Sequence, residues 1–155
     1  MRDIRFIAEH RGGSLKKDQH RQIISWACNC AGHILPLFDV VKNDRLKNIL
    51  NIGKEWEKGI VSTVDVRKAS MDAITLANET LDQVSVAVAR AVGHGVATAH
   101  MADHSLVAAT YALKAIQLAG NSIDDERKWQ NDQLPVEIRE LVLSAGSQKV
   151  KNLKK

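Results

Sequence analysis

The chain of 155 residues is short of the features that mark sheets, disulfide frameworks and membrane spans. Aromatic residues make up 4% of it, and it has two prolines and two cysteines. With abundant alanine, this composition favours helices. No alternation of period two is long enough for a sheet. The length suits a single domain, so we expect an all-α, single-domain bundle of about six helices.

Two classes of protein are excluded by missing apolar stretches. No apolar run approaches the roughly 20 residues that cross a bilayer. The first nine residues carry charges where a signal peptide needs an uninterrupted apolar stretch. We therefore expect a cytoplasmic protein that does not act at a membrane.

The formal net charge of +4 is unevenly distributed along the chain. Residues 1–60 carry +4, residues 61–146 carry −4 and residues 147–155 carry +4. The excess thus equals the charge of a short C-terminal segment, which is more typical of a solubilising end than of nucleic-acid binding. We expect one helical domain over residues 1–146, a flexible Lys-rich tail over residues 147–155, and no nucleic-acid partner.

The segment 91–120 is rich in alanine, glycine and histidine and is predicted to form the central helix. At helical spacing, one stripe of mostly small residues contains Gly93, Ala97, His100, His104, Ala108, Tyr111, Ala115 and Leu118. Small side chains let neighbouring backbones come close. Gly93 and Gly95 are therefore predicted to mark either a kink or a close backbone contact.

Capping and breaking residues predict the ends of the helices. Helix starts are expected at Ser14, Asn43 or Asp44, Ser62 or Thr63, Ser122 and Pro135. Helix ends are expected near Pro36, Gly59, Gly120 and Gly146. A further helical segment over residues 84–90 should run toward the two glycines of the central helix.

His100 and His104 are four residues apart, which places two imidazoles on one helix face, as in zinc enzymes. Asp103 could be a third ligand or could orient either ring. No glutamate follows the first histidine, as it would in a zinc-protease helix. On one straight helix His94 would point about 80° away from His104. Hydrogen-bonded core histidines are the favoured interpretation, and no metal or cofactor is expected.

Cys28 and Cys30 are two residues apart on a predicted helix, so their side chains diverge and a disulfide between them is not expected. We expect buried thiols that act as small hydrophobic residues. A catalytic pair of Cys30 with His33 lacks an evident third orienting group.

Motifs spread over most of the chain resemble a known bacterial family. They are Trp26-Ala-x-Cys-Ala in an inexact form, Leu35-Pro36, Asn43-Asp-Arg45, Trp56-x-x-Gly59, Ala91-x-Gly-His-x-Val-Ala-Thr-Ala-His100, Ala102-Asp-His104, Ala109-x-Tyr-Ala-x-Lys-Ala115 and Glu126-Arg-x-Trp-Gln130. This pattern resembles the immunity-protein-five-like family of polymorphic toxin systems, from about Glu9 to Leu143. The motif residues of interest are Asp44, Arg45, His94, His100, Asp103, His104, Tyr111, Arg127 and Trp129.

The resemblance implies a small helical protein that binds and neutralises a cognate toxin by blocking its surface, without turnover. It transfers no catalytic residues. The alternative is a small metal-dependent or acid–base enzyme that uses His94, His100, Asp103 and His104. An acidic surface made of Asp132, Glu137 and Glu140 is the predicted contact with a toxin, because many toxins that act on nucleic acids have basic clefts. The sequence leaves open whether the chain forms homo-oligomers.

Overall fold

The structure, a computed structural model, describes residues 3–38 and 43–154. It confirms the all-α class, with seven α-helices and no strands in the described residues. The α-helices are α1 (Lys17–His33), α2 (Asn43–Glu57), α3 (Thr63–Glu79), α4 (Gln83–Ala97), α5 (His104–Leu118), α6 (Ile123–Asp132) and α7 (Val136–Lys154). Three short 3-10 helices are η1 (Ile4–Phe6), η2 (Glu9–Arg11) and η3 (Leu35–Leu37).

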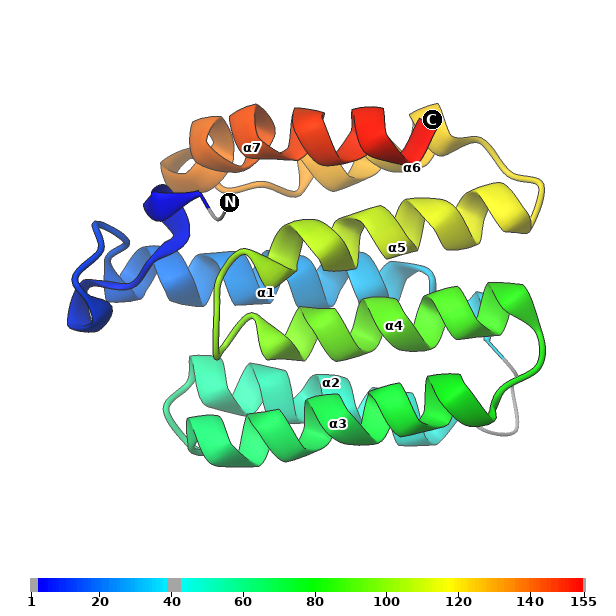
Figure 1. Cartoon of the computed structure of the whole chain (residues 1–155), viewed down its shortest axis with the longest axis horizontal. Coiled ribbons are helices and arrows are strands. Elements are labelled where there is room, and N and C mark those ends of the chain that lie inside the picture. The colour runs from blue at the N-terminus through cyan, green and yellow to red at the C-terminus, as the bar shows by residue number, and fades with distance from the viewer. Residues whose placement is uncertain (1–2, 39–42, 155) are drawn as a thin grey trace.

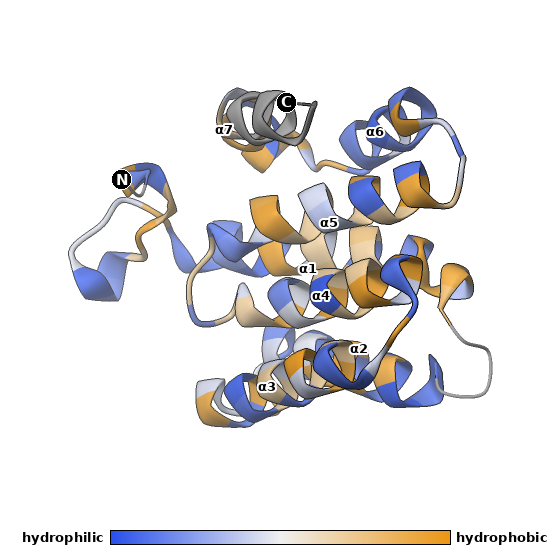
Figure 2. Ribbon diagram, turned by 45° about the vertical axis from the view of Figure 1, so that its right-hand side comes forward, coloured by the Kyte–Doolittle hydropathy of each residue, from blue (hydrophilic) through white to orange (hydrophobic). Residues whose placement is uncertain are grey.

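The central element of the bundle is α4, which packs against α1, α2, α3 and α5. On one side of the molecule, α2 and α3 lie against α4, and on the other side α6 and α7 cover α5 and part of α1 (Figure 1). In Figure 2, hydrophilic colours dominate α6, whereas hydrophobic colours are frequent on α5 beneath it. Four helices can pack against α4 because many of its residues are small, so that few side-chain atoms separate it from its neighbours.

The prediction of one continuous helix over residues 91–120 is wrong. The chain turns at residues 98–103, so α4 and α5 form an antiparallel pair. The Nε2 atom of His20, on α1, lies 2.5 Å from the carbonyl oxygen of Thr98. Because a carbonyl only accepts, this nitrogen must donate the hydrogen. The bond is made to the carbonyl oxygen that residue 102 would use in a continuing helix.

Gly93 and Gly95 lie inside α4 and mark close contacts, which confirms one of the two predicted roles. A Cβ atom at Gly95 would lie 3.5 Å from the carbonyl oxygen of Ala27 on α1. At Gly93 it would lie 3.4 Å from the Cβ of Ala73 on α3. The hydroxyl of Ser70 also donates to the Gly93 carbonyl at 3.0 Å. Neighbouring helices therefore approach the α4 backbone from two sides.

Two of the predicted caps are present as expected. Ser62 accepts a hydrogen bond from the Asp65 amide at the start of α3, and Ser122 accepts one from the Asp125 amide at the start of α6. The glycines expected at helix ends, Gly59 and Gly120, have positive φ angles of 79° and 82°. This backbone conformation is nearly free of strain only for glycine.

Two predicted boundaries are wrong. Ser14 does not cap α1, because the backbone of Leu15 instead pairs with Ile7 and Glu9. The helix therefore begins two residues later, after Lys16. Gly146 does not end the last helix, since α7 continues to Lys154. The flexibility of the segment 147–155 stays a prediction, and Lys155 lies outside the described residues.

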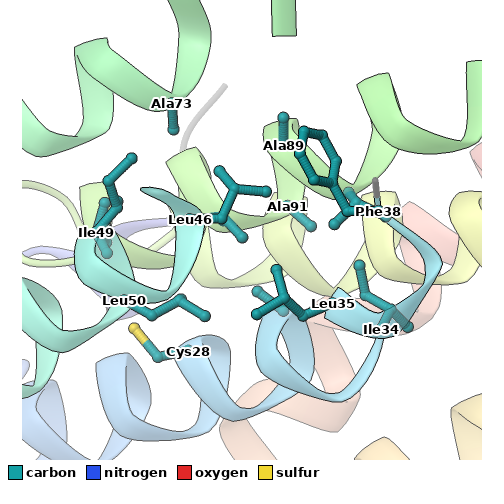
Figure 3. Close-up of a cluster of buried hydrophobic side chains, with 14 of the residues drawn as sticks. Cys28, Ile34, Leu35, Phe38, Leu46, Ile49, Leu50, Ala73, Ala89 and Ala91 are labelled. Carbon is teal, nitrogen blue, oxygen red and sulfur yellow. The ribbon is translucent and has the colours of Figure 1, made fainter. Parts of the chain in front are cut away.

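Buried side chains form two hydrophobic clusters. The larger one joins η3 and α1 through α5, and Figure 3 shows Cys28 of α1 facing Leu50 of α2 within it. The smaller one joins the N-terminal segment, α1, α5 and α7, with Trp26 and Ile138 among its members. No helix in the described part of the chain combines the length and the apolar character that a bilayer crossing requires.

Candidate functional site

The turn between α4 and α5 brings two of the predicted histidines together. The Nδ1 atoms of His94 and His104 lie 3.0 Å apart, and the ring centroids are separated by 5.1 Å. The expectation that these rings diverge is wrong, because it assumed that both lie on one straight helix. The family motifs point to both histidines, but the sequence analysis did not predict the turn that brings them into contact.

Tyr111 and Arg90 extend this histidine pair along the outer side of α4 and α5. The Tyr111 ring stacks on His94 at 5.6 Å between centroids, and the Arg90 guanidinium carbon lies 5.8 Å from the Tyr111 centroid. Burial, followed by the nearby His104 and Arg90, lowers the pKa of His94 to about 4. The two facing Nδ1 atoms need one hydrogen between them, so one ring must be an acceptor there.

His100 and Asp103 lie in the connecting turn and are half-buried. Both residues take part in further interactions. Asp103 directly precedes α5 but makes no side-chain cap to that helix. Within residues 3–38 and 43–154, no group of three or more His, Cys, Asp or Glu side chains is arranged to hold a metal ion. The pair His94–His104 can exchange a proton between its nitrogens, which is the acid–base chemistry that this geometry offers.

A second polar cluster, which the sequence analysis did not assemble, joins α1 to α6. The Nδ1 atom of His33 lies 2.7 Å from a carboxylate oxygen of the buried Glu126. The His33 ring also stacks on Trp129, with centroids 3.5 Å apart and planes 9° from parallel. The motif Glu126-Arg-x-Trp-Gln130 carried the signal for this cluster, but its partner on α1 lies 93 residues away.

The next residues of the same motif hold α6 against the bundle. The Trp26 indole donates to the Gln130 carbonyl at 2.8 Å, and the Gln130 amide donates to the Ala109 carbonyl at 3.1 Å. Trp26, Gln130 and Ala109 come from α1, α6 and α5, and all three are buried. These bonds fix the position of α6 and, with it, that of Arg127, whose Nη1 lies 3.5 Å from Asp124.

Arg45 and Asp44 make ion pairs with residues outside both clusters. The Nε atom of Arg45 lies 3.2 Å from Asp72 on α3, and its Nη2 atom makes a second, shorter bond to the same carboxylate. This hydrogen-bonded guanidinium lowers the pKa of Asp72. The Asp44 carboxylate is exposed, with Lys47 at 3.9 Å. The ion pair of Arg45 with Asp72 therefore links α2 to α3 at the surface, and neither Arg45 nor Asp44 joins the histidines.

The three acidic residues of the predicted contact surface lie at the end of α6 and the start of α7. Asp132, Glu137 and Glu140 are exposed. Asp132 lies 3.5 Å from the Lys128 amine, and the charge of Glu140 contributes to raising the pKa of Arg5, after the larger effect of Asp3. Lys128 and Arg5 thus offset part of the negative charge, which the linear sequence did not show.

The two cysteines are free and buried, as predicted. Burial raises the pKa of Cys28 to about 12 and that of Cys30 well above its ordinary value. A thiol that does not ionise near neutral pH is a poor nucleophile. The structure therefore gives no support to a reactive pair of Cys30 with His33, whose carboxylate partner is Glu126.

Comparison with known proteins identifies a family but no individual relative. No curated protein and no solved structure matches the chain. A family model described as Imm-5 like putative immunity protein matches residues 13–137. The match includes both polar clusters and extends from the segment before α1 to the first turn of α7. The chain belongs to this family, the Imm-5 like putative immunity proteins.

Proposed function

We propose that this protein binds a cognate bacterial toxin and neutralises it by covering part of its surface, without turnover. The observation that carries the proposal is the family match, which covers residues 13–137. An immunity protein must present a stable surface to a folded partner. The bundle supplies such a surface, because the interhelical bonds of Trp26 and Gln130 hold α6 in place.

The toxin-binding surface that we propose is the exposed acidic one formed by Asp132, Glu137 and Glu140. Complementary charge accelerates the encounter of two proteins, and the acceleration falls as salt screens it. A toxin with a basic cleft would be steered to these residues. Lys128 and Arg5 reduce the local charge, so we expect a moderate acceleration of association.

The test requires the cognate toxin. The gene next to the one for this protein is the first candidate to encode it. Co-expression of the two proteins should restore growth that the toxin alone prevents. Stopped-flow association is then measured at two ionic strengths for the wild type and for a triple variant with Asp132, Glu137 and Glu140 changed to Lys. We expect the variant to associate more slowly and with a weaker salt dependence, since the attraction is reversed.

A second triple variant with the same net charge is the matched control. It changes Asp18, Asp44 and Glu79 to Lys, all of which are exposed on α1, α2 and α3. If the control slows association as much as the first variant, the effect is one of total charge and the proposed surface is wrong. An unchanged rate for both variants places the contact elsewhere. Failure of co-expression to protect cells refutes this toxin as the partner.

The alternative function is acid–base catalysis, and the observation that favours it is the 3.0 Å contact between the His94 and His104 nitrogens. The two functions respond differently to His94→Gln combined with His104→Gln. Protection by binding should survive these substitutions in a variant that stays folded by circular dichroism. Loss of protection with intact, stoichiometric binding to the toxin would favour catalysis.

A further inference from the structure

A cavity of about 210 Å³ lies where α6 and α7 cover α1 and α5. Most of its wall is apolar and comes from Trp26, Leu106, Ala109, Leu113 and Val142. Arg127 of α6 is the charged residue in this wall. Asp132, Glu137 and Glu140 do not line it, so the cavity is separate from the acidic surface.

The guanidinium of Arg127 has an edge without a partner. Its Nε and Nη2 atoms are closed to solvent and have no hydrogen-bond acceptor among the described residues. Among residues 3–38 and 43–154, the acidic neighbour of the guanidinium is the exposed Asp124, which lies 3.5 Å from Nη1. Buried polar groups are nearly always hydrogen-bonded, and a charged donor left unpaired is especially unfavourable. The Nε–Nη2 edge therefore requires an acceptor that the described residues do not supply.

The same edge in two other arginines of this protein shows what fits it. Arg5 directs Nε and Nη2 to the carboxylate of Asp3, at 3.0 and 2.6 Å. Arg45 directs the same two atoms to the carboxylate of Asp72. A planar guanidinium edge and a carboxylate match as two parallel hydrogen bonds. The acceptor best suited to Arg127 is therefore a carboxylate.

The size and lining of the cavity indicate the rest of the ligand. An engineered protein cavity of about 150 Å³ lined by apolar side chains binds benzene. The cavity here is larger, at about 210 Å³, and has Trp26 and Leu113 in its wall. It has room for one ring or a branched carbon chain together with a carboxylate. In the structure, the Nε and Nη2 atoms are closed to solvent and so do not face the cavity. Rotation of the Arg127 head group about its outer torsions would turn this unpaired edge toward the carboxylate of a ligand in the cavity.

We propose that the cavity between α1, α5, α6 and α7 binds a small monocarboxylate with an apolar body, held by the Nε–Nη2 edge of Arg127. The apolar body lies against Trp26 and Leu113, and the carboxylate lies at α6. The ligand then contacts all four helices around the cavity. This binding does not depend on the toxin and can be tested on the isolated protein.

The test uses benzoate as the probe and benzyl alcohol as its uncharged counterpart. Binding is followed by intrinsic tryptophan fluorescence, to which Trp26 contributes, and by amide chemical shifts of the residues around the cavity in the full-length protein. We expect saturable benzoate binding with shifts on α5, α6 and α7. Arg127→Met should weaken benzoate binding roughly tenfold or more, since two charge-assisted hydrogen bonds are lost. Its effect on benzyl alcohol should be small.

Two further variants make the result specific. Arg67→Met removes the same charge from an exposed position on α3 and should leave benzoate binding unchanged. Ala109→Leu fills the cavity and should abolish binding of both probes, and circular dichroism verifies that each variant is folded. Absence of benzoate binding, or equal affinity in the wild type and Arg127→Met, overturns the proposal. Equal affinity for benzoate and benzyl alcohol overturns the assignment of a carboxylate.

Discussion

Two glycines on neighbouring helices should respond in opposite ways to the same substitution. Gly53 of α2 and Gly95 of α4 are both buried in helix interiors, where alanine is favoured over glycine by about 1 kcal/mol. They differ in the space around the added methyl group. At Gly95 the nearest atom is the Ala27 carbonyl oxygen at 3.5 Å, an ordinary contact. Gly95→Ala should therefore stabilise the protein by up to about 1 kcal/mol.

At Gly53 the added carbon would lie 2.9 Å from a Val96 methyl and 3.0 Å from the Cys28 sulfur. Both neighbours are buried, and the valine is stiff about its first side-chain torsion. Overpacking of this kind costs about 1–3 kcal/mol, from which the helix preference of about 1 kcal/mol is subtracted. Gly53→Ala should thus destabilise the protein by up to about 2 kcal/mol.

Urea unfolding followed by circular dichroism at pH 7 measures both changes. The slope with urea concentration should be the same in the two variants, so that the midpoints report stability alone. The urea midpoint should be highest for Gly95→Ala, intermediate for the wild type and lowest for Gly53→Ala. If Gly53→Ala is as stabilising as Gly95→Ala, the close packing of α2 against α1 and α4 is refuted.

Three further predictions concern the polar clusters and the thiols. The pKa of His94 is about 4 in the folded protein, below the ordinary 6.5, so the unfolded chain binds the proton first and stability should fall as the pH drops from about 6.5 to 4. Over this pH range, the urea midpoint should fall less in His94→Gln than in the wild type, and an equal fall would contradict the assignment. Glu126→Ala removes the acceptor of His33 and should cost about 1–3 kcal/mol by urea unfolding, whereas a loss below about 0.5 kcal/mol would show that the contact contributes little. Cys28 and Cys30 should react with a chromogenic disulfide reagent only after unfolding, and rapid reaction of the native protein would contradict their burial.

The sequence was most informative where local chemistry decides the structure. Ser62 and Ser122 cap their helices through the amide three residues later, and Gly59 takes the positive φ that ends α2. Such features depend on neighbouring residues, so spacing alone predicts them. The burial of Cys28 and Cys30 also followed from their place on an apolar helix.

The sequence was least informative where a distant residue decides the structure. Nothing within residues 98–103 is a strong helix breaker, and the residue that binds the Thr98 carbonyl in the turn, His20, lies 78 positions earlier. The same limitation hid the contact of Glu126 with His33. Because the turn was missed, the contact of His94 with His104 was missed too. The prediction of a central Ala- and Gly-rich helix holds for α4 alone.

The two binding proposals can fail independently although both involve α6 and α7. The acidic surface acts through exposed carboxylates, whose effect on association falls with salt. The cavity acts through Arg127, whose Nε and Nη2 atoms are closed to solvent. Arg127→Met lowers the net charge by one unit and so should not reduce attraction to a basic toxin. If Arg127→Met nevertheless slowed toxin association, the toxin would contact the Arg127 region as well as the acidic surface, and the cavity would then belong to the toxin interface.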